Sequence, residues 1–176
     1  MLHRARGGDA EAMRQLGLWH AAGESGCARD AGWAAFWFFQ AWQSGLDAAE
    51  ADIIRIREPL EDAAAAGSAE AQNALGLILR FGHDEPRAAA DWFARAGDQG
   101  HPEALRSLGN LFESGHGVPQ NDELAVEFYR KAANLGDPFA QFNLAILIDR
   151  GRGAERAPAA VRHWLKLAAD QGMKEA

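Results

Sequence analysis

Cysteine is almost absent from this sequence of 176 residues, in which Cys27 stands alone. One cysteine excludes an internal disulfide and any metal site built from several cysteines. Long hydrophobic runs are also missing. No segment approaches the roughly 18 apolar residues of a membrane-spanning helix, and residues 1–8 lack the apolar core of a secretory signal. From the sequence as written we expect a cytoplasmic protein without membrane insertion; a lost amino-terminal signal would instead make it periplasmic.

Dense runs of lysine and arginine are missing as well. The formal net charge is -7 and the pI is about 5.3. Proteins that bind nucleic acids need clustered basic side chains to neutralise phosphates and release counterions. The most basic stretches here are short and interrupted by acidic or apolar residues, so we expect no nucleic-acid partner. They lie around Arg4 and Arg6, and around Arg150, Arg152 and Arg156.

Motifs of catalysis and metal binding are the third absence. The six histidines include no pair three or four residues apart, and no HExxH arrangement occurs. Cys27 has no histidine nearby in the sequence that could activate it as a nucleophile. No glycine-rich nucleotide fingerprint follows a strand-like segment. We therefore predict no catalytic residue, no metal site and no cofactor, and expect a protein that is not an enzyme.

What the sequence does contain is a pattern that recurs at intervals of roughly 33 to 37 residues. In each copy an aromatic residue is followed four positions later by an alanine, and a glycine closes the unit. Self-similarity of this kind indicates stacked pairs of helices, each completing the core of its neighbours. The aromatic and alanine columns are Trp37 and Ala41, Trp92 and Ala96, Phe128 and Ala132, and Trp164 and Ala168.

These columns divide one repeat domain over residues 1–176 into four full units and one shortened unit. The boundaries are about 8–45, a shortened unit at 46–66, then 67–99, 100–135 and 136–172. The first residues resemble the tail of a helix ending at a glycine, and the last residues resemble the start of another unit. Because both ends fall in mid-pattern, we expect a fragment of a longer repeat protein or a lost capping helix.

The second helix of the first unit, about Asp30 to Gln43, carries six aromatic residues within ten positions. That is more than a single apolar stripe requires. We expect neighbouring helices to bury it, with an exposed aromatic surface as the alternative. Such a surface around Trp37 and Trp42 would support self-association.

The run ALRSLGNLFESGHGVPQNDELAVEFYRKAANLG, residues 104–136, resembles the Sel1-like repeat, whose pattern is A…LG..Y..G.GV..D...A..WY..AA..G. The resemblance extends over nearly all of the chain except the shortened unit. It implies an all-α fold, a right-handed superhelical solenoid of antiparallel helix pairs related to tetratricopeptide repeats. Members of the family, many of them bacterial, usually act as adaptors or scaffolds.

The resemblance therefore implies a non-enzymatic scaffold that binds a partner peptide or protein along the concave groove of the repeats. The alternative is a small-molecule binder or weak hydrolase of the penicillin-recognising branch of the family. That branch pairs cysteines within its repeats, which Cys27 alone cannot do.

Groove-facing positions follow from the related tetratricopeptide geometry, one helical face away from the leucine and glycine that pack inside each unit. Arginines there would pair with carboxylates of a peptide, asparagines would hold an extended backbone, and apolar residues would anchor side chains. The alternative is that the arginines pair with nearby acidic residues of the chain itself. The predicted partner-binding residues are Arg14, Asn73, Leu77, Arg80, Arg106, Asn110, Glu113, Phe142, Ile146 and Asp149.

Overall fold

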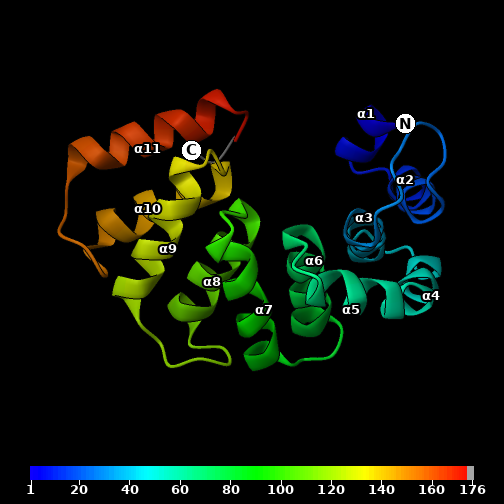
Figure 1. Ribbon diagram of the computed structural model, residues 1–176. Helices are drawn as coiled ribbons and strands as arrows, with labels where there is room; N and C mark the ends of the chain where they lie inside the picture. Colours follow the sequence, from blue (N-terminus) through cyan, green and yellow to red (C-terminus); the bar gives the residue numbers. More distant parts are fainter. Residues whose placement is uncertain (174–176) are drawn as a thin grey trace. The chain divides into compact units, whose positions relative to one another are not determined.

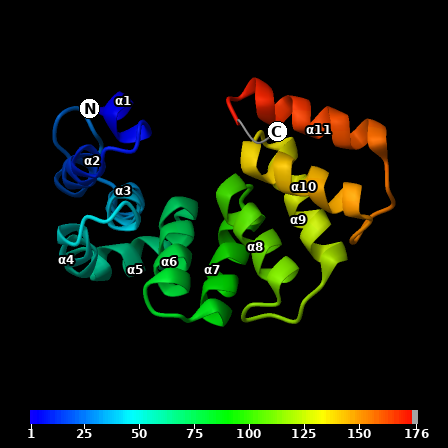
Figure 2. The same cartoon turned by 180° about the vertical axis from the view of Figure 1, so that it is seen from behind.

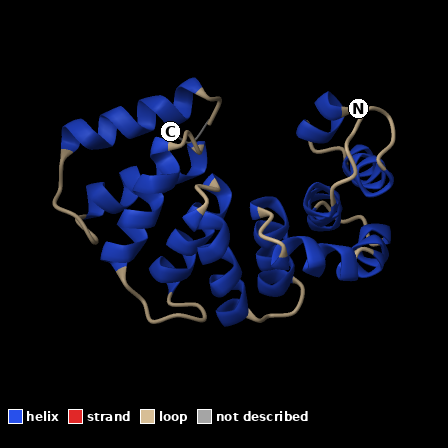
Figure 3. Cartoon of the chain, viewed as in Figure 1, coloured by secondary structure: helices blue, strands red, loops and turns tan. Residues whose placement is uncertain are grey.

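The computed structural model describes residues 1–173, and this range contains eleven α-helices and no strand (Figure 1; Figure 3). The chain forms two compact units that divide between Asp84 and Glu85. The first unit contains α1 (Leu2–Arg6), α2 (Ala10–Ala22), α3 (Ala31–Gln43), α4 (Ala48–Arg55), α5 (Arg57–Ala65) and α6 (Ala69–Phe81). The second contains α7 (Pro86–Asp98), α8 (Pro102–Ser114), α9 (Asp122–Asn134), α10 (Pro138–Arg150) and α11 (Pro158–Asp170).

Most helices begin at a side-chain cap. Asp9, Ser68 and Asp137 each accept a hydrogen bond from the backbone N–H three residues later, which satisfies one of the free donors of the first turn. Asn121 caps α9 in the same way, with its Oδ1 3.0 Å from the backbone nitrogen of Leu124. Four helices also have proline as their first residue, where the missing N–H costs no hydrogen bond.

Six helices end in the same hydrogen-bonded turn, in which a glycine adopts a positive φ angle. At the end of α9, Gly136 donates to the Ala133 carbonyl and Asp137 donates to the Ala132 carbonyl. Glycine is favoured there because other residues are strained in the left-handed region. α1 ends in this turn too, which confirms the helix tail predicted at the start of the chain. The six glycines are Gly8, Gly45, Gly67, Gly100, Gly136 and Gly172.

In the first unit, the aromatic helix α3 packs against α2, α4, α5 and α6. Trp37, Phe38 and Phe39 are buried, whereas Trp33 is 40% exposed. Burial between neighbouring helices, the first of the two interpretations of this helix, therefore describes three of its six aromatic residues, and Phe36 and Trp42 are half-buried. A Cβ atom added at Gly17 would lie 2.5 Å from the Phe38 ring, so only glycine lets α2 and α3 approach this closely.

The shortened unit between α3 and α6 folds as two short helices, α4 and α5. The side-chain amide of Gln72 donates to the Ala64 carbonyl at the end of α5 (3.0 Å). Gln141 makes the same bond to the Ala133 carbonyl at the end of α9 (3.2 Å), again over eight residues. α5 therefore ends as the second helix of a full unit ends, although the helix before it is only eight residues long.

In the second unit, α9 packs against both α8 and α10, and α11 packs against α10 (Figures 1 and 2). The core along these helices includes Leu105, Tyr129 and Leu144. A Cβ atom at Gly109 would lie 2.5 Å from the Tyr129 ring, as at Gly17 in the first unit. The helix-interior glycine and the aromatic residue that packs on it therefore recur as a pair.

Within the second compact unit, the turn between the two helices of a repeat packs on the preceding repeat. A Cβ atom at Gly117 would lie 2.7 Å from backbone atoms of Pro86 and Arg87 at the start of α7. At Gly153 it would lie 2.1 Å from the Asp122 carbonyl oxygen at the start of α9. Backbone atoms cannot move aside as side chains do, so these glycines determine how closely successive repeats approach.

Substitution of Leu108 tests the packing between α8 and α7. Its side chain is 4% exposed and lies near Gly97 of α7. We expect Leu108→Ala to lower the free energy of unfolding by about 2–5 kcal/mol, because it removes buried methyl groups and leaves a cavity. Urea unfolding followed by circular dichroism measures the change. Leu135→Ala, at a leucine that is 54% exposed, is the control and should change stability by under about 0.5 kcal/mol.

Gly153→Ala tests the contact between units. Gly136→Ala is its matched control, because both glycines have positive φ angles and only Gly153 has backbone atoms where the new Cβ would lie. We expect Gly153→Ala to cost at least about 1 kcal/mol more than Gly136→Ala in the same urea experiment. Equal costs would mean that strain in φ, and not the close approach of the two units, explains glycine at this position.

Candidate functional site

Six of the ten predicted partner-binding residues lie on α8 and α10 of the second unit. On α8 they are Arg106, Asn110 and Glu113, and on α10 they are Phe142, Ile146 and Asp149. Spacings of three and four residues place each set on one face of its helix. Asp149 is exposed and the other five are half-buried. Contacts of Arg106 with Phe139 and of Asn110 with Asn143 connect the two helices. The six predicted residues, together with Asn143, are here called the α8–α10 surface.

The other four predicted residues lie in the first unit, and the structure does not leave all of them at the surface. Asn73 and Leu77 on α6 are buried, at 0% and 5% exposure, so they are not available to contact a partner. The Arg80 guanidinium lies 4.7 Å from the centroid of the Phe81 ring. Nε of Arg14 lies 2.6 Å from the carboxylate of Asp52, which is itself buried. This ion pair raises the pKa of Arg14 and joins α2 to α4.

Arg106 connects α8 to the start of α10. Its guanidinium lies 3.2 Å from carboxylate oxygens of both Glu103 and Asp137, and 5.3 Å from the centroid of the Phe139 ring. Asp137 also caps α10 by accepting from the backbone of Ala140. Arg14 and Arg106 are thus both paired with acidic residues of the chain itself, as the alternative interpretation of the arginines expects.

A tyrosine that the sequence did not single out supports two of the predicted residues. The ring of Tyr129 is fully buried against Gly109 of α8, and its hydroxyl donates to Oε2 of Glu113 at 2.8 Å. The same hydroxyl also contacts Oδ1 of Asn110. Burial and the adjacent negative charge of Glu113 raise the pKa of Tyr129 well above its ordinary value. Two predicted residues are therefore held in place by one buried side chain.

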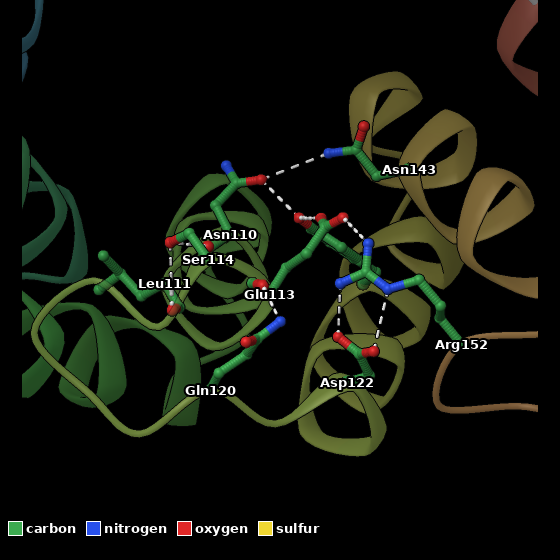
Figure 4. Close-up of polar contacts among 9 residues, drawn as sticks. Asn110, Leu111, Glu113, Ser114, Gln120, Asp122, Asn143 and Arg152 are labelled. Atoms are coloured by element: carbon green, nitrogen blue, oxygen red, sulfur yellow. Dashed lines mark hydrogen bonds and ion pairs between the residues drawn. The ribbon is translucent and has the colours of Figure 1, made fainter. Parts of the chain in front are cut away.

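Arg152, in the turn after α10, extends this network across the repeats. Its guanidinium donates two hydrogen bonds to Asp122 at the start of α9, of 2.9 and 2.7 Å. It donates a third to Oε1 of Glu113 on α8, at 3.2 Å (Figure 4). A planar guanidinium suits this paired geometry. The pairing with Asp122 raises the pKa of Arg152. Sequence reasoning noted Arg152 only as part of a short basic stretch.

Asn143 on α10 completes the surface and was also missed. Its side-chain nitrogen lies 3.4 Å from Oδ1 of Asn110, so the two amides meet between α8 and α10. Within residues 1–173, the Asn110 amide nitrogen and the Asn143 amide oxygen have no partner. Figure 4 shows both atoms directed away from the network. A side-chain donor and a side-chain acceptor therefore lie at the two outer ends of the contact between Asn110 and Asn143.

No group of three or more histidine, cysteine, aspartate or glutamate side chains in residues 1–173 is placed to hold a metal ion. None of the helices described is both long enough and apolar enough to cross a membrane.

Comparison with known proteins explains the repeated geometry. The Sel1 repeat profile matches four segments, residues 10–46, 69–101, 102–137 and 138–173. The chain belongs to the Sel1-repeat family. Each matched segment of this Sel1-repeat chain contains two helices, and the two short helices α4 and α5 lie in the unmatched interval between the first two segments. The α8–α10 surface is thus formed by the first helices of the third and fourth matched repeats.

Curated relatives of this Sel1-repeat chain include chitin synthase regulatory factor 3 of Schizosaccharomyces pombe. It is 32% identical over 125 residues, which cover 68% of this chain and 13% of the relative. A second is the ERAD-associated E3 ubiquitin-protein ligase component HRD3B of Arabidopsis thaliana, 32% identical over 109 residues, or 59% of this chain and 16% of the relative. The chain therefore spans less than a fifth of the length of either.

Among solved structures, the chain is similar to a protective antigen of uropathogenic Escherichia coli with a Sel1-like repeat fold. The TM-score is 0.67 at 26% identity, over 96% of this chain and 40% of the other. Together with the eleven helices, this similarity confirms the predicted all-α solenoid of helix pairs.

Tyr129 provides a direct test of the network, because it is the only tyrosine in the chain. Its raised pKa means that the folded protein keeps the hydroxyl proton at a pH where an unfolded tyrosine, with a pKa of about 10, has lost it. The free energy of unfolding should therefore fall as the pH rises past about 10. Alkaline titration of tyrosinate absorbance should show no ionisation of the folded protein at the ordinary pKa.

Glu113→Gln removes the negative charge beside the hydroxyl and should lower the pKa of Tyr129, while burial keeps it above the ordinary value. Glu127→Gln is the control, since Glu127 is exposed on α9 and pairs with Lys131 instead. A folded native chain that titrates with a midpoint near 10 would contradict the enclosed hydroxyl.

Proposed function

We propose that this Sel1-repeat chain is a non-enzymatic protein-interaction scaffold and that a partner peptide or protein binds along the α8–α10 surface. The family assignment supports the general role. The names of the two relatives describe a regulatory factor and a component of a ligase, which are roles exercised through other proteins. Repeat proteins of this kind also use extended surfaces formed by successive units.

The arrangement of Asn110 and Asn143 is the observation on which the proposed site rests. Each amide has both a donor and an acceptor, and their mutual contact uses one of each. The remaining donor and acceptor match the N–H and C=O groups of an extended peptide. The buried Tyr129 hydroxyl holds Asn110 and Glu113, so little side-chain entropy is lost when a peptide binds.

Apolar anchors flank the two amides. Phe142 and Ile146 are half-buried on α10, on either side of Asn143 in sequence, and Phe139 at the start of the helix is 54% exposed. Binding energy at such surfaces comes mainly from a few apolar or aromatic anchors, while hydrogen bonds fix the register. The partner segment is therefore an extended stretch with at least one apolar side chain directed at α10.

Chemistry within the same network supports binding over catalysis. The Tyr129 hydroxyl and both Glu113 carboxylate oxygens take part in hydrogen bonds or ion pairs with one another and with Arg152. The guanidinium of Arg152 is shared between Glu113 and Asp122. These groups are thus used to hold the surface together, which leaves no nucleophile and general base facing a common substrate position among them.

Affinity capture with two variants tests the proposed site. The double variant Phe142→Ala and Ile146→Ala should retain the helical circular dichroism spectrum and lose specific partners that the native chain retains from lysate. Leu135→Ala, which removes an exposed apolar side chain at the end of α9, should retain the same partners. Binding to a synthetic peptide from the captured partner should weaken about tenfold or more in the double variant.

Equal retention by the double variant and the native chain would remove the α8–α10 surface from the proposal. A second assay addresses the catalytic alternative. The purified chain should not turn over a chromogenic beta-lactam, and turnover that rises in proportion to protein concentration would contradict the non-enzymatic role.

A further inference from the structure

A small apolar cleft lies in the first unit, where the shortened segment meets its neighbours. It has a volume of about 90 Å³. One wall is Trp42 of α3, and a second is Ile78 of α6 with Gly82 and His83, which follow that helix. The third wall is α4. On α4 the lining residues are Glu50, Ile53 and Ile54, whose spacing of three and four places them on one face.

The length of α4 explains why apolar groups remain uncovered here. α4 has eight residues and α6 has 13, which correspond to about 12 Å and about 20 Å of helix. The shorter helix covers less of α3 and α6 than a full first helix would. Ile54 is 68% exposed and Ile53 is half-buried, although both carry large apolar side chains. Covering them would remove apolar surface from water and favour binding.

The charge beside the cleft indicates what kind of group covers it. Glu50 is exposed, lines the cleft and has no ion-pair partner within residues 1–173. Arg55, a basic residue on the same helix, is paired with the buried carboxylate of Asp52 at 3.2 Å. A positive charge from outside would therefore complement Glu50, and the indole of Trp42 adds an electron-rich ring to the same cleft.

We propose that this cleft is a second protein-binding site, which takes a leucine-like side chain with a lysine next to it in the partner sequence. The volume suits one branched aliphatic side chain. The ammonium group of the lysine pairs with Glu50 while its aliphatic stem lies along Ile54. This site lies in the first unit and uses none of the residues of the α8–α10 surface.

Short peptides test the proposal on the full chain. The probes are acetyl-Gly-Leu-Lys-Gly-amide, the same peptide with glutamate in place of lysine, and the same peptide with serine in place of leucine. Methyl NMR should show the Leu-Lys peptide shifting resonances of Ile53, Ile54 and Ile78. The Leu-Glu peptide should bind about fivefold more weakly, and the Ser-Lys peptide about tenfold more weakly.

Variants assign the preference to its residues. Glu50→Gln should abolish the difference between the Leu-Lys and Leu-Glu peptides. Glu58→Gln should preserve it, because Glu58 is an exposed glutamate on α5 outside the cleft. Ile54→Ala should weaken binding of both peptides. Equal affinity of the native chain for the Leu-Lys and Leu-Glu peptides, or no shift of the three isoleucines, would overturn the proposal.

The double variant Phe142→Ala and Ile146→Ala distinguishes this site from the α8–α10 surface. It should bind the Leu-Lys peptide with the affinity of the native chain. Loss of that binding would overturn the proposal of a separate site, whatever the outcome of affinity capture at the α8–α10 surface.

Discussion

In the first and third matched repeats, the contact between an aromatic ring and a helix-interior glycine sets how closely the two helices approach. It occurs as Gly17 with Phe38 and as Gly109 with Tyr129, with the added Cβ atom 2.5 Å from the ring in both. Any larger residue would push the helices apart. The capping residues and closing turns define where each helix begins and ends, but this contact decides which faces meet. The side chains that remain at the surface are those on the helix faces opposite this ring–glycine contact.

Tyrosine at one of these contacts links the packing to the proposed site. Phe38 and Tyr129 occupy the same position, yet only Tyr129 carries a hydroxyl that reaches Asn110 and Glu113 on the facing helix. One oxygen atom therefore converts a packing contact, which both repeats share, into a support for surface side chains, which only the third matched repeat has. The polar surface is in this sense an extension of the core.

Much of the fold could be predicted from the sequence because it depends on contacts within one repeat. The aromatic and alanine columns, the closing glycines and the cap at the start of α9 all act over a few residues or between paired helices. The contacts of Arg152 with Asp122 and Glu113 span 30 and 39 residues, and no periodic pattern of the sequence predicts them. Asn73 and Leu77 were assigned to a groove by their place in the repeat, but α6 is buried on more faces than the other first helices.

Arg152 has a consequence for how this array could have changed by duplication. It lies between two turn glycines of the fourth matched repeat and is bound to both helices of the third. The corresponding turn of the third repeat carries His116 instead. A copy of the third repeat inserted between them would present a histidine to one neighbour, whereas exchange of the two repeats would leave Asp122 and Glu113 without their arginine. The contacts of Arg152 with Asp122 and Glu113 are therefore kept only when the third and fourth matched repeats stay adjacent and in this order.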